Sequence, residues 1–155
     1  MTRFTTIIDG VDQICLDEHG DDRGDLVAIE EGNGIPFQMN RVYYIYNTSA
    51  NVTRGKHAHK DLHQVLLCIN GSCDILVDNG RERRTVHLDT PSKGIYIHSF
   101  VWREMSNFAP NTVLLAIVDK KYDINDYVFD YAAVSNSNGA DRKSTRLNSS
   151  HSKIS

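Results

Sequence analysis

The sequence predicts an all-β fold, a small antiparallel β-barrel or sandwich of the jelly-roll type. Short segments rich in β-branched and aromatic residues follow one another closely along the chain. Asn-Gly pairs separate several of these segments, and no long stretch carries a helical period. A chain of 155 residues can bury one hydrophobic core, so we expect a single domain over residues 1–134.

The expected strands begin at residue 26 and continue to residue 119. They cover residues 26–31, 41–48, 64–69, 72–78, 83–89, 94–105 and 112–119. The Asn-Gly pair at 70–71 predicts a hairpin between two apolar runs, and the pair at 79–80 predicts the next turn. A short C-terminal helix is expected within 123–133, where Asp123 is the candidate N-cap.

The last 21 residues differ in kind from the rest of the chain. Residues 135–155 are polar, rich in Ser and Asn, and nearly free of core-forming side chains. This composition predicts disorder. The stretch RKSTRLNSSHSKIS also resembles read-through from a sequencing adaptor, so we exclude the tail, His151 included, from functional interpretation.

Composition and charge exclude several classes of protein. The formal net charge of −3 gives no electrostatic argument for binding nucleic acid or a membrane. No apolar run approaches the roughly 20 residues of a membrane span, and MTRFTTIIDG lacks the apolar core of a signal peptide. Three cysteines without CxxC spacing, at 15, 68 and 73, favour free thiols over disulfides or a zinc site. The sequence therefore predicts a cytoplasmic protein.

The segment RGKHAHKD (54–61) contains the strongest functional signal. In an extended chain His57 and His59 project to the same face. Such a pair could bind a metal, exchange protons with a ligand, or lie exposed on an outer wall. The preceding strand carries Arg41 and Tyr43, and polar side chains directed into a small barrel require a ligand or mutual hydrogen bonds. We therefore favour a polar pocket over a solvated surface.

The HxH pattern in a small barrel resembles the first metal motif of the cupins. The acidic position of that motif is occupied here by His63 or Gln64. Arg103 stands where the last histidine ligand belongs, and a guanidinium that stays protonated is a poor metal ligand. Zinc held by His57, His59 and His63 remains the lesser alternative. The favoured interpretation is a metal-free acid/base pair.

Residue chemistry alone leads to a general substrate class. Histidine, with an unperturbed pKa near 6.5, takes and returns protons at neutral pH. Arginine holds phosphate through paired hydrogen bonds. Together they indicate proton transfer on a phosphorylated or nucleotide-linked substrate.

A family resemblance extends this interpretation. The blocks RVYYIY, RGKHAHK, LDTPSKG, VWREM and YDINDY occur in order within about residues 22–131. They resemble the sugar-nucleotide 3,4-ketoisomerases, cupins of the group also called the WxcM-like C-terminal domain. Two departures stand out: Arg103 replaces a histidine found in many relatives, and the acidic segment 17–22 is longer than the usual approach to the first strand.

The resemblance implies an isomerase that moves the ketone of dTDP-4-keto-6-deoxyglucose from C4 to C3 through an enediol. The product would lead to dTDP-3-amino-3,6-dideoxyhexoses for lipopolysaccharide or other surface glycans. His57 is then the candidate base and His59 its proton-shuttling partner, with no cofactor and no metal. The candidate substrate-binding residues are Arg41, Tyr43, Arg54, Gln64, Trp102 and Arg103, although a lone Trp in a sheet is as often core. The resemblance also implies a homodimer that exchanges N-terminal strands, with residues 26–31 at the interface.

Three other functions stay open at this point. A dTDP-sugar 3,5-epimerase would invert stereocentres and normally uses one histidine base paired with an aspartate. A metal-dependent cupin oxygenase would contain bound iron or manganese. A non-catalytic nucleotide-sugar-binding cupin would bind the sugar without exchanging its C3 proton with solvent.

Overall fold

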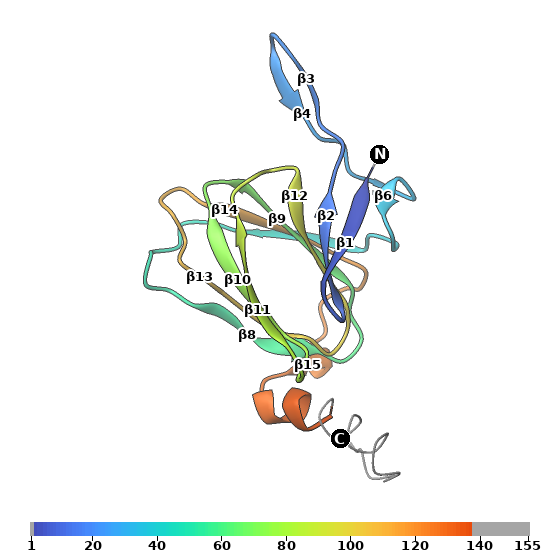
Figure 1. Cartoon of the computed structure of the whole chain (residues 1–155), viewed down its shortest axis with the longest axis vertical. Coiled ribbons are helices and arrows are strands. Elements are labelled where there is room, and N and C mark those ends of the chain that lie inside the picture. The colour runs from blue at the N-terminus through green and yellow to red at the C-terminus, as the bar shows by residue number, and fades with distance from the viewer. Residues whose placement is uncertain (1, 138–155) are drawn as a thin grey trace.

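The computed structural model describes residues 2–137, which form two facing antiparallel sheets (Figure 1). The six-stranded sheet has the order β1 (Arg3–Ile8), β2 (Val11–Cys15), β12 (Lys93–Ile97), β9 (Gln64–Asn70), β14 (Val113–Val118) and β7 (Arg41–Ile45). The five-stranded sheet has the order β11 (Arg83–Leu88), β10 (Cys73–Asp78), β13 (Trp102–Ser106), β8 (Arg54–His59) and β15 (Tyr127–Val128). The prediction of an all-β, jelly-roll-like fold is confirmed.

The main core lies between the two sheets. Side chains alternate along each strand, so every second residue points inward. The six-stranded sheet contributes Val11, Leu66, Cys68, Ile95, Ile97, Leu114 and Ala116, and the five-stranded sheet contributes Cys73, Ile75, Val77, Leu88 and Met105. Tyr43 and Ile45 of β7 pack against this apolar layer.

The Asn-Gly pair at 70–71 does not form the predicted hairpin. β9 pairs with β12 and β14, whereas β10 pairs with β11 and β13. The turn therefore crosses from one sheet to the other. Both strands present a buried apolar face, and these faces pack across the core instead of lying side by side. The turn predicted at 79–80 is confirmed, and it joins the paired strands β10 and β11.

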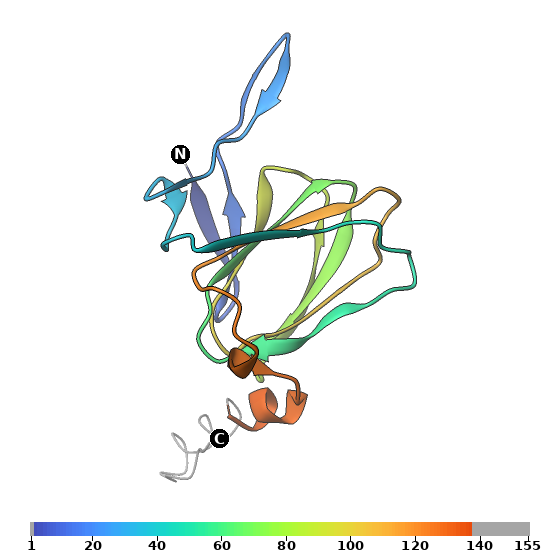
Figure 2. The same ribbon diagram turned by 180° about the vertical axis from the view of Figure 1, so that it is seen from behind.

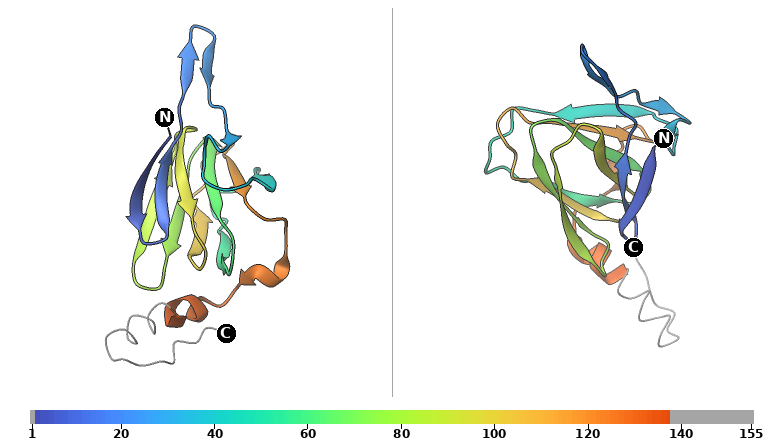
Figure 3. Two further views of the ribbon diagram at one scale, coloured as in Figure 1. Left: turned by 90° about the vertical axis from the view of Figure 1, so that its right-hand side faces the viewer. Right: turned by 45° about the horizontal axis from the view of Figure 1, so that its top comes forward.

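Several N-terminal strands were not predicted. β1 and β2 complete the six-stranded sheet, while β3 (His19–Asp21) and β4 (Gly24–Leu26) form a hairpin arm that projects from the body (Figures 1 and 3). Two short strands follow, β5 (Glu30–Glu31) and β6 (Gly34–Ile35). The predicted strand 26–31 is thus interrupted, and Val27 and Ile29 in its middle pack on a second apolar cluster with Ile14 and Val65.

The C-terminal segment contains two short helical turns. A 3-10 turn, η1 (Ile124–Asp126), begins at Asp123, whose side chain accepts a hydrogen bond from the backbone N–H of Asn125. Residues 131–137 are helical and lie at the end of the body opposite the arm (Figure 2). The helix expected within 123–133 is therefore split, and the expected domain boundary at 134 falls inside the second helix. The rest of the predicted disordered tail lies outside the described residues.

Within residues 2–137, no helix is long and apolar enough to cross a membrane.

Candidate active site

A β-bulge in β8 directs both histidines inward. Gly55 and Lys56 have positive φ angles of 85° and 57°, and the pairing with β13 shifts register between Arg103 and Glu104. A Cβ atom at position 55 would lie 3.0 Å from the carbonyl oxygen of Arg103, so glycine is required by both space and conformation. After the bulge, His57 is the cross-strand partner of Arg103.

The two imidazoles form one cluster with Tyr127. The ring centroids of His57 and His59 are 4.8 Å apart and nearly perpendicular. The Tyr127 ring lies 4.8 Å from His57 and 4.4 Å from His59, because β15 pairs with β8 at this point. The three rings are therefore in mutual contact.

Both histidines are neutral near pH 7. Burial lowers the pKa of His57 to about 4, and the positive charge of Arg103 adds to this shift. Burial followed by the charge of Arg103 also lowers the pKa of His59 well below its ordinary value. A neutral imidazole has an unprotonated ring nitrogen, which is the form that a general base requires.

His59 has a defined tautomer. Its Nδ1 lies 2.9 Å from Oδ2 of Asp126, and the other oxygen of Asp126 accepts the backbone N–H of Asp61 at 2.7 Å. An ionised carboxylate only accepts hydrogen bonds, so Nδ1 of the neutral imidazole carries the proton. Nε2 of His59 is consequently left free to accept one.

Arg103 is a fully buried cation, with 0% of its surface exposed. Its Nε and Nη2 donate to the carbonyl oxygen of Val101 at 3.3 and 3.1 Å, and Nη1 donates to Oε1 of Gln64. Burial lowers its pKa only to about 10, so the guanidinium stays charged at neutral pH. All three hydrogen bonds are accepted by neutral oxygens, so no carboxylate of the described residues hydrogen-bonds to this cation. Its positive charge contributes to the lowered pKa of His57 and His59.

A cavity of about 340 Å³ opens in front of these groups. It is lined by Arg41, Tyr43, Ile45, Arg54, Gly55, His57, Met105 and Tyr127. The guanidinium of Arg41 lies over the Tyr43 ring, 5.4 Å from its centroid, and its Nε is buried without a hydrogen-bond partner among the described residues. A buried donor of this kind is completed by an acceptor on a ligand, and a phosphate oxygen fits it.

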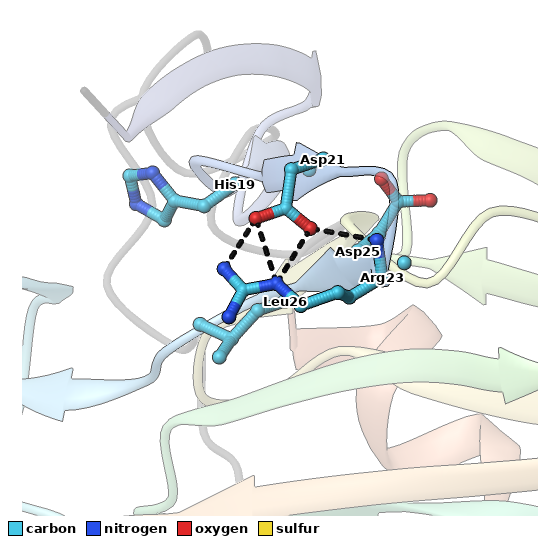
Figure 4. Close-up of a pocket in the computed structure, with 7 residues that line it drawn as sticks. His19, Asp21, Arg23, Asp25 and Leu26 are labelled. Atoms are coloured by element: carbon cyan, nitrogen blue, oxygen red, sulfur yellow. Dashed lines mark hydrogen bonds and ion pairs between the residues drawn. The ribbon is translucent and has the colours of Figure 1, made fainter.

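The arm carries another hollow of about 410 Å³, shown in Figure 4. Two charged side chains in this hollow are paired with each other, because the guanidinium of Arg23 donates to both carboxylate oxygens of Asp21. Both residues are strongly exposed. All the residues that line this hollow are exposed, whereas His59 beside the barrel cavity is buried.

The structure brings together most of the predicted site. His57, Arg41, Tyr43 and Arg54 line the cavity, while His59 lies directly behind His57. Two further predicted substrate-binding residues, Gln64 and Arg103, are buried one layer deeper.

Trp102 lies elsewhere. Its side chain lies on the face of β13 opposite to that of Arg103, and its indole N–H donates to Glu104 at 2.9 Å. Its ring packs edge-on against Tyr131, with 5.6 Å between the ring centroids. Its position under the C-terminal helix supports the core alternative rather than a wall of the sugar pocket.

The three histidines of the zinc alternative do not converge. His63 hydrogen-bonds through Nδ1 to the Tyr96 hydroxyl at 2.7 Å and lies among Phe37 and His98, outside the barrel cavity. In the part of the chain that the structure describes, no group of three or more His, Cys, Asp or Glu side chains could hold a metal ion.

Sequence interpretation missed Asp126 and Tyr127. Both belong to the YDINDY block, one of the blocks that carry the family resemblance. The chain brings this block back across the end of the barrel, a path that no local pattern predicts.

Comparisons with known proteins agree with this geometry. Residues 9–139 match the family model described as FdtA: WxcM-like, C-terminal. A TDP-4-oxo-6-deoxy-α-D-glucose-3,4-oxoisomerase from Aneurinibacillus thermoaerophilus is 46% identical over 111 residues, covering 72% of this chain and 80% of that protein.

Two solved structures are similar over most of the chain, and both are of QdtA, a sugar 3,4-ketoisomerase from Thermoanaerobacterium thermosaccharolyticum. The complex with TDP has a TM-score of 0.82 and 39% identity, covering 88% of this chain and 98% of that one. A His-to-Asn variant with bound TDP-4-keto-6-deoxyglucose has a TM-score of 0.81 and 37% identity, covering 92% and 100%.

Proposed function

Because this chain belongs to the FdtA family, described as WxcM-like, C-terminal, we propose that it is an isomerase that converts dTDP-4-keto-6-deoxyglucose into its 3-keto isomer. The observation that carries this function is the neutral imidazole of His57, which faces a cavity lined by two arginines and two tyrosines. A related chain with 46% identity bears the name of this activity.

Proton abstraction is the first chemical step. The neutral His57 takes the proton from C3, the C3–C4 double bond forms, and the C4 carbonyl oxygen gains negative charge. Developing negative charge is stabilised by donors that are already in place, and the buried charge of Arg103 together with the hydroxyl of Tyr43 can supply this stabilisation.

Proton return completes the isomerisation. His57 returns its proton to C4 of the enediolate, and the proton of the C3 hydroxyl passes to the oxygen on C4, which leaves a ketone at C3 and a hydroxyl at C4. His59 lies against His57 with its Nε2 unprotonated, so it can accept a proton from its neighbour and hand it back. No net proton is consumed, as an isomerisation requires.

The nucleotide would be held by the arginines. Arg41 and Arg54 line the same cavity, and two guanidinium groups match the charge of a pyrophosphate. The unpartnered Nε of Arg41 supports this role. We assign the tyrosine side of the cavity, Tyr43 and Tyr127, to the sugar.

The biological setting follows from the product. A 3-keto sugar nucleotide is a substrate for an aminotransferase, so the product would supply 3-amino-3,6-dideoxyhexoses for surface glycans. Three cysteines that are all free thiols support a reducing compartment, the cytoplasm.

The working unit in this proposal is a homodimer that exchanges N-terminal strands. The β3–β4 arm projects from the body and exposes 59% of Leu26. At the open edge of the six-stranded sheet, β7 exposes Val42 and Tyr44, and Tyr46 directly after the strand is exposed as well. An extended arm and an unpaired edge with apolar side chains are the two halves of a strand-exchange interface.

A solvent-exchange experiment tests the function. Purified protein is incubated with dTDP-4-keto-6-deoxyglucose in D₂O, and the sugar is followed by NMR. We expect deuterium at the carbon that regains a proton and a carbonyl signal that moves from C4 to C3. Inverted stereocentres with the ketone still at C4 would identify an epimerase, and binding without exchange would identify a non-catalytic module.

A further inference from the structure

Three polar side chains form one continuous hydrogen-bond chain inside the barrel. Nη1 of Arg103 donates to Oε1 of Gln64, and Nε2 of Gln64 donates to the hydroxyl oxygen of Tyr43 at 2.7 Å. Gln64 is only 1% exposed and Arg103 is 0% exposed, so water does not compete for these groups. Tyr43 is the one member of the three that lines the cavity.

The donors and acceptors along these two hydrogen bonds have a fixed order. A guanidinium carries only donors, so it requires the carbonyl end of the Gln64 amide to face it. The NH₂ end must then face Tyr43, whose oxygen becomes the acceptor. Turning the amide over would place its N–H groups against the N–H groups of Arg103 and leave a buried oxygen unsatisfied. The hydrogen of the Tyr43 hydroxyl is therefore free to be donated elsewhere.

The strand arrangement explains how one amide reaches both partners. Gln64 on β9 and Tyr43 on β7 are separated by β14, where the small Ala116 is the register partner of Tyr43. Arg103 extends from β13 of the opposite sheet. Gln64 thus connects the two sheets at the base of the cavity, and this position suits an orienting role rather than direct contact with substrate.

We propose that Gln64 is a positioning residue that presents the Tyr43 hydroxyl as a hydrogen-bond donor to the sugar oxygen that gains charge. The inference rests on the proposed ketoisomerase function. The oxygen of Tyr43 already accepts from Gln64, and Gln64 already accepts from the Arg103 cation. Each bond polarises the next, so the buried charge strengthens the donor at the cavity without touching substrate.

The sharpest test reverses the direction of the hydrogen bond between residue 64 and Tyr43. In Gln64→Glu the new carboxylate has nearly the same shape but only accepts, so it still binds Arg103 and takes the Tyr43 hydroxyl hydrogen for itself. A carboxylate beside the buried guanidinium forms a paired ion, which favours folding. We expect kcat to fall by about 10²-fold.

A double-mutant cycle with Tyr43→Phe separates this role from general damage. If Gln64 acts through the Tyr43 hydroxyl, Gln64→Glu should cost less than about tenfold in the Tyr43→Phe background. Gln64→Leu, which removes the orienting amide without adding charge, should show the same dependence on Tyr43. Equal losses in both backgrounds would overturn the proposal.

A binding measurement gives a readout that does not depend on turnover. In the His57→Asn background, we expect Gln64→Glu to weaken binding of dTDP-4-keto-6-deoxyglucose about tenfold and to leave TDP affinity unchanged, since TDP lacks the keto-hexose that would accept from Tyr43. Unchanged sugar-nucleotide affinity would refute the role of Gln64. Absence of isomerisation by the wild-type protein would instead refute the proposed function.

Discussion

Oδ2 of Asp126 lies 2.9 Å from Nδ1 of His59, although 67 residues separate the two in the sequence. The carboxylate belongs to a single 3-10 turn, and its second oxygen is held by the backbone N–H of Asp61. Because this carboxylate is itself fixed, it sets both the ring orientation and the protonated nitrogen of His59. Under the proposed function, Asp126 would therefore be a positioning residue for the acid/base pair of His57 and His59.

Asp126→Asn tests this arrangement. An amide at this position would keep the bond to Asp61 with its oxygen and turn its NH₂ toward Nδ1, so His59 would carry its proton on Nε2 instead. We expect kcat to fall by roughly 10²-fold while TDP affinity is unchanged. Steady-state kinetics and calorimetry measure the two quantities.

Asp123→Asn is the matched control. Asp123 lies in the same turn and caps it, and asparagine caps equally well, so this variant should keep full activity. An equal loss in both variants would mean that Asp126 only stabilises the turn.

His57→Asn should abolish isomerisation and preserve binding. Asparagine fills similar space but cannot take a proton, and loss of a general base costs about 10²–10⁴-fold in rate. His87→Asn, at an exposed position on the five-stranded sheet, is the control and should behave like wild type. Activity of His57→Asn within threefold of the wild-type rate would remove this residue from the role of base.

In the pH profile of kcat/KM, the decline on the acid side should occur at an unusually low pH. A base with a pKa of about 4 stays neutral well below the ordinary histidine value of 6.5, so kcat/KM should remain level down to about pH 5. Arg103→Gln removes a positive charge that disfavours the protonated imidazole. The pKa of His57 should then rise, and the decline in kcat/KM should begin at higher pH. A profile that does not shift would show that Arg103 has no electrostatic effect on His57.

Local patterns in the sequence predicted the all-β class and most strands from residue 41 onward, but not the N-terminal strands or the surroundings of the histidines. Alternating apolar residues and the HxH spacing are local signals, and the structure places His57 at the cavity and His59 in the interior as the spacing predicted. The partner strands of β9 and β10 depend instead on which buried faces pack together, so the Asn-Gly pair at 70–71 predicted a hairpin that does not form. The contact of Asp126 with His59 depends on the path of a distant segment, which leaves no trace in the local pattern.

Assembly can be tested at the edge of the six-stranded sheet. Tyr44 on β7 is 61% exposed, and a charge there would oppose apolar contact with a partner's arm. Light scattering at micromolar concentration should show a dimer for wild type and a smaller species for Tyr44→Lys. Glu82→Lys, in the exposed turn between β10 and β11, should remain dimeric. A monomeric wild-type protein would contradict the strand-exchange proposal.

Activity should survive treatment with a chelator. A catalytic metal site needs three converging ligands and an open position. Here Nδ1 of His59 is already bonded to Asp126, His63 lies outside the cavity, and the permanent charge of Arg103 lies beside His57 and would repel a divalent cation. Proton abstraction next to a ketone needs no metal when protein donors stabilise the oxygen. The rate after EDTA and dialysis should therefore equal the untreated rate. Activity that is lost and returns only with zinc, iron or manganese would show that the HxH pair binds metal, and that its role as a metal-free base is wrong.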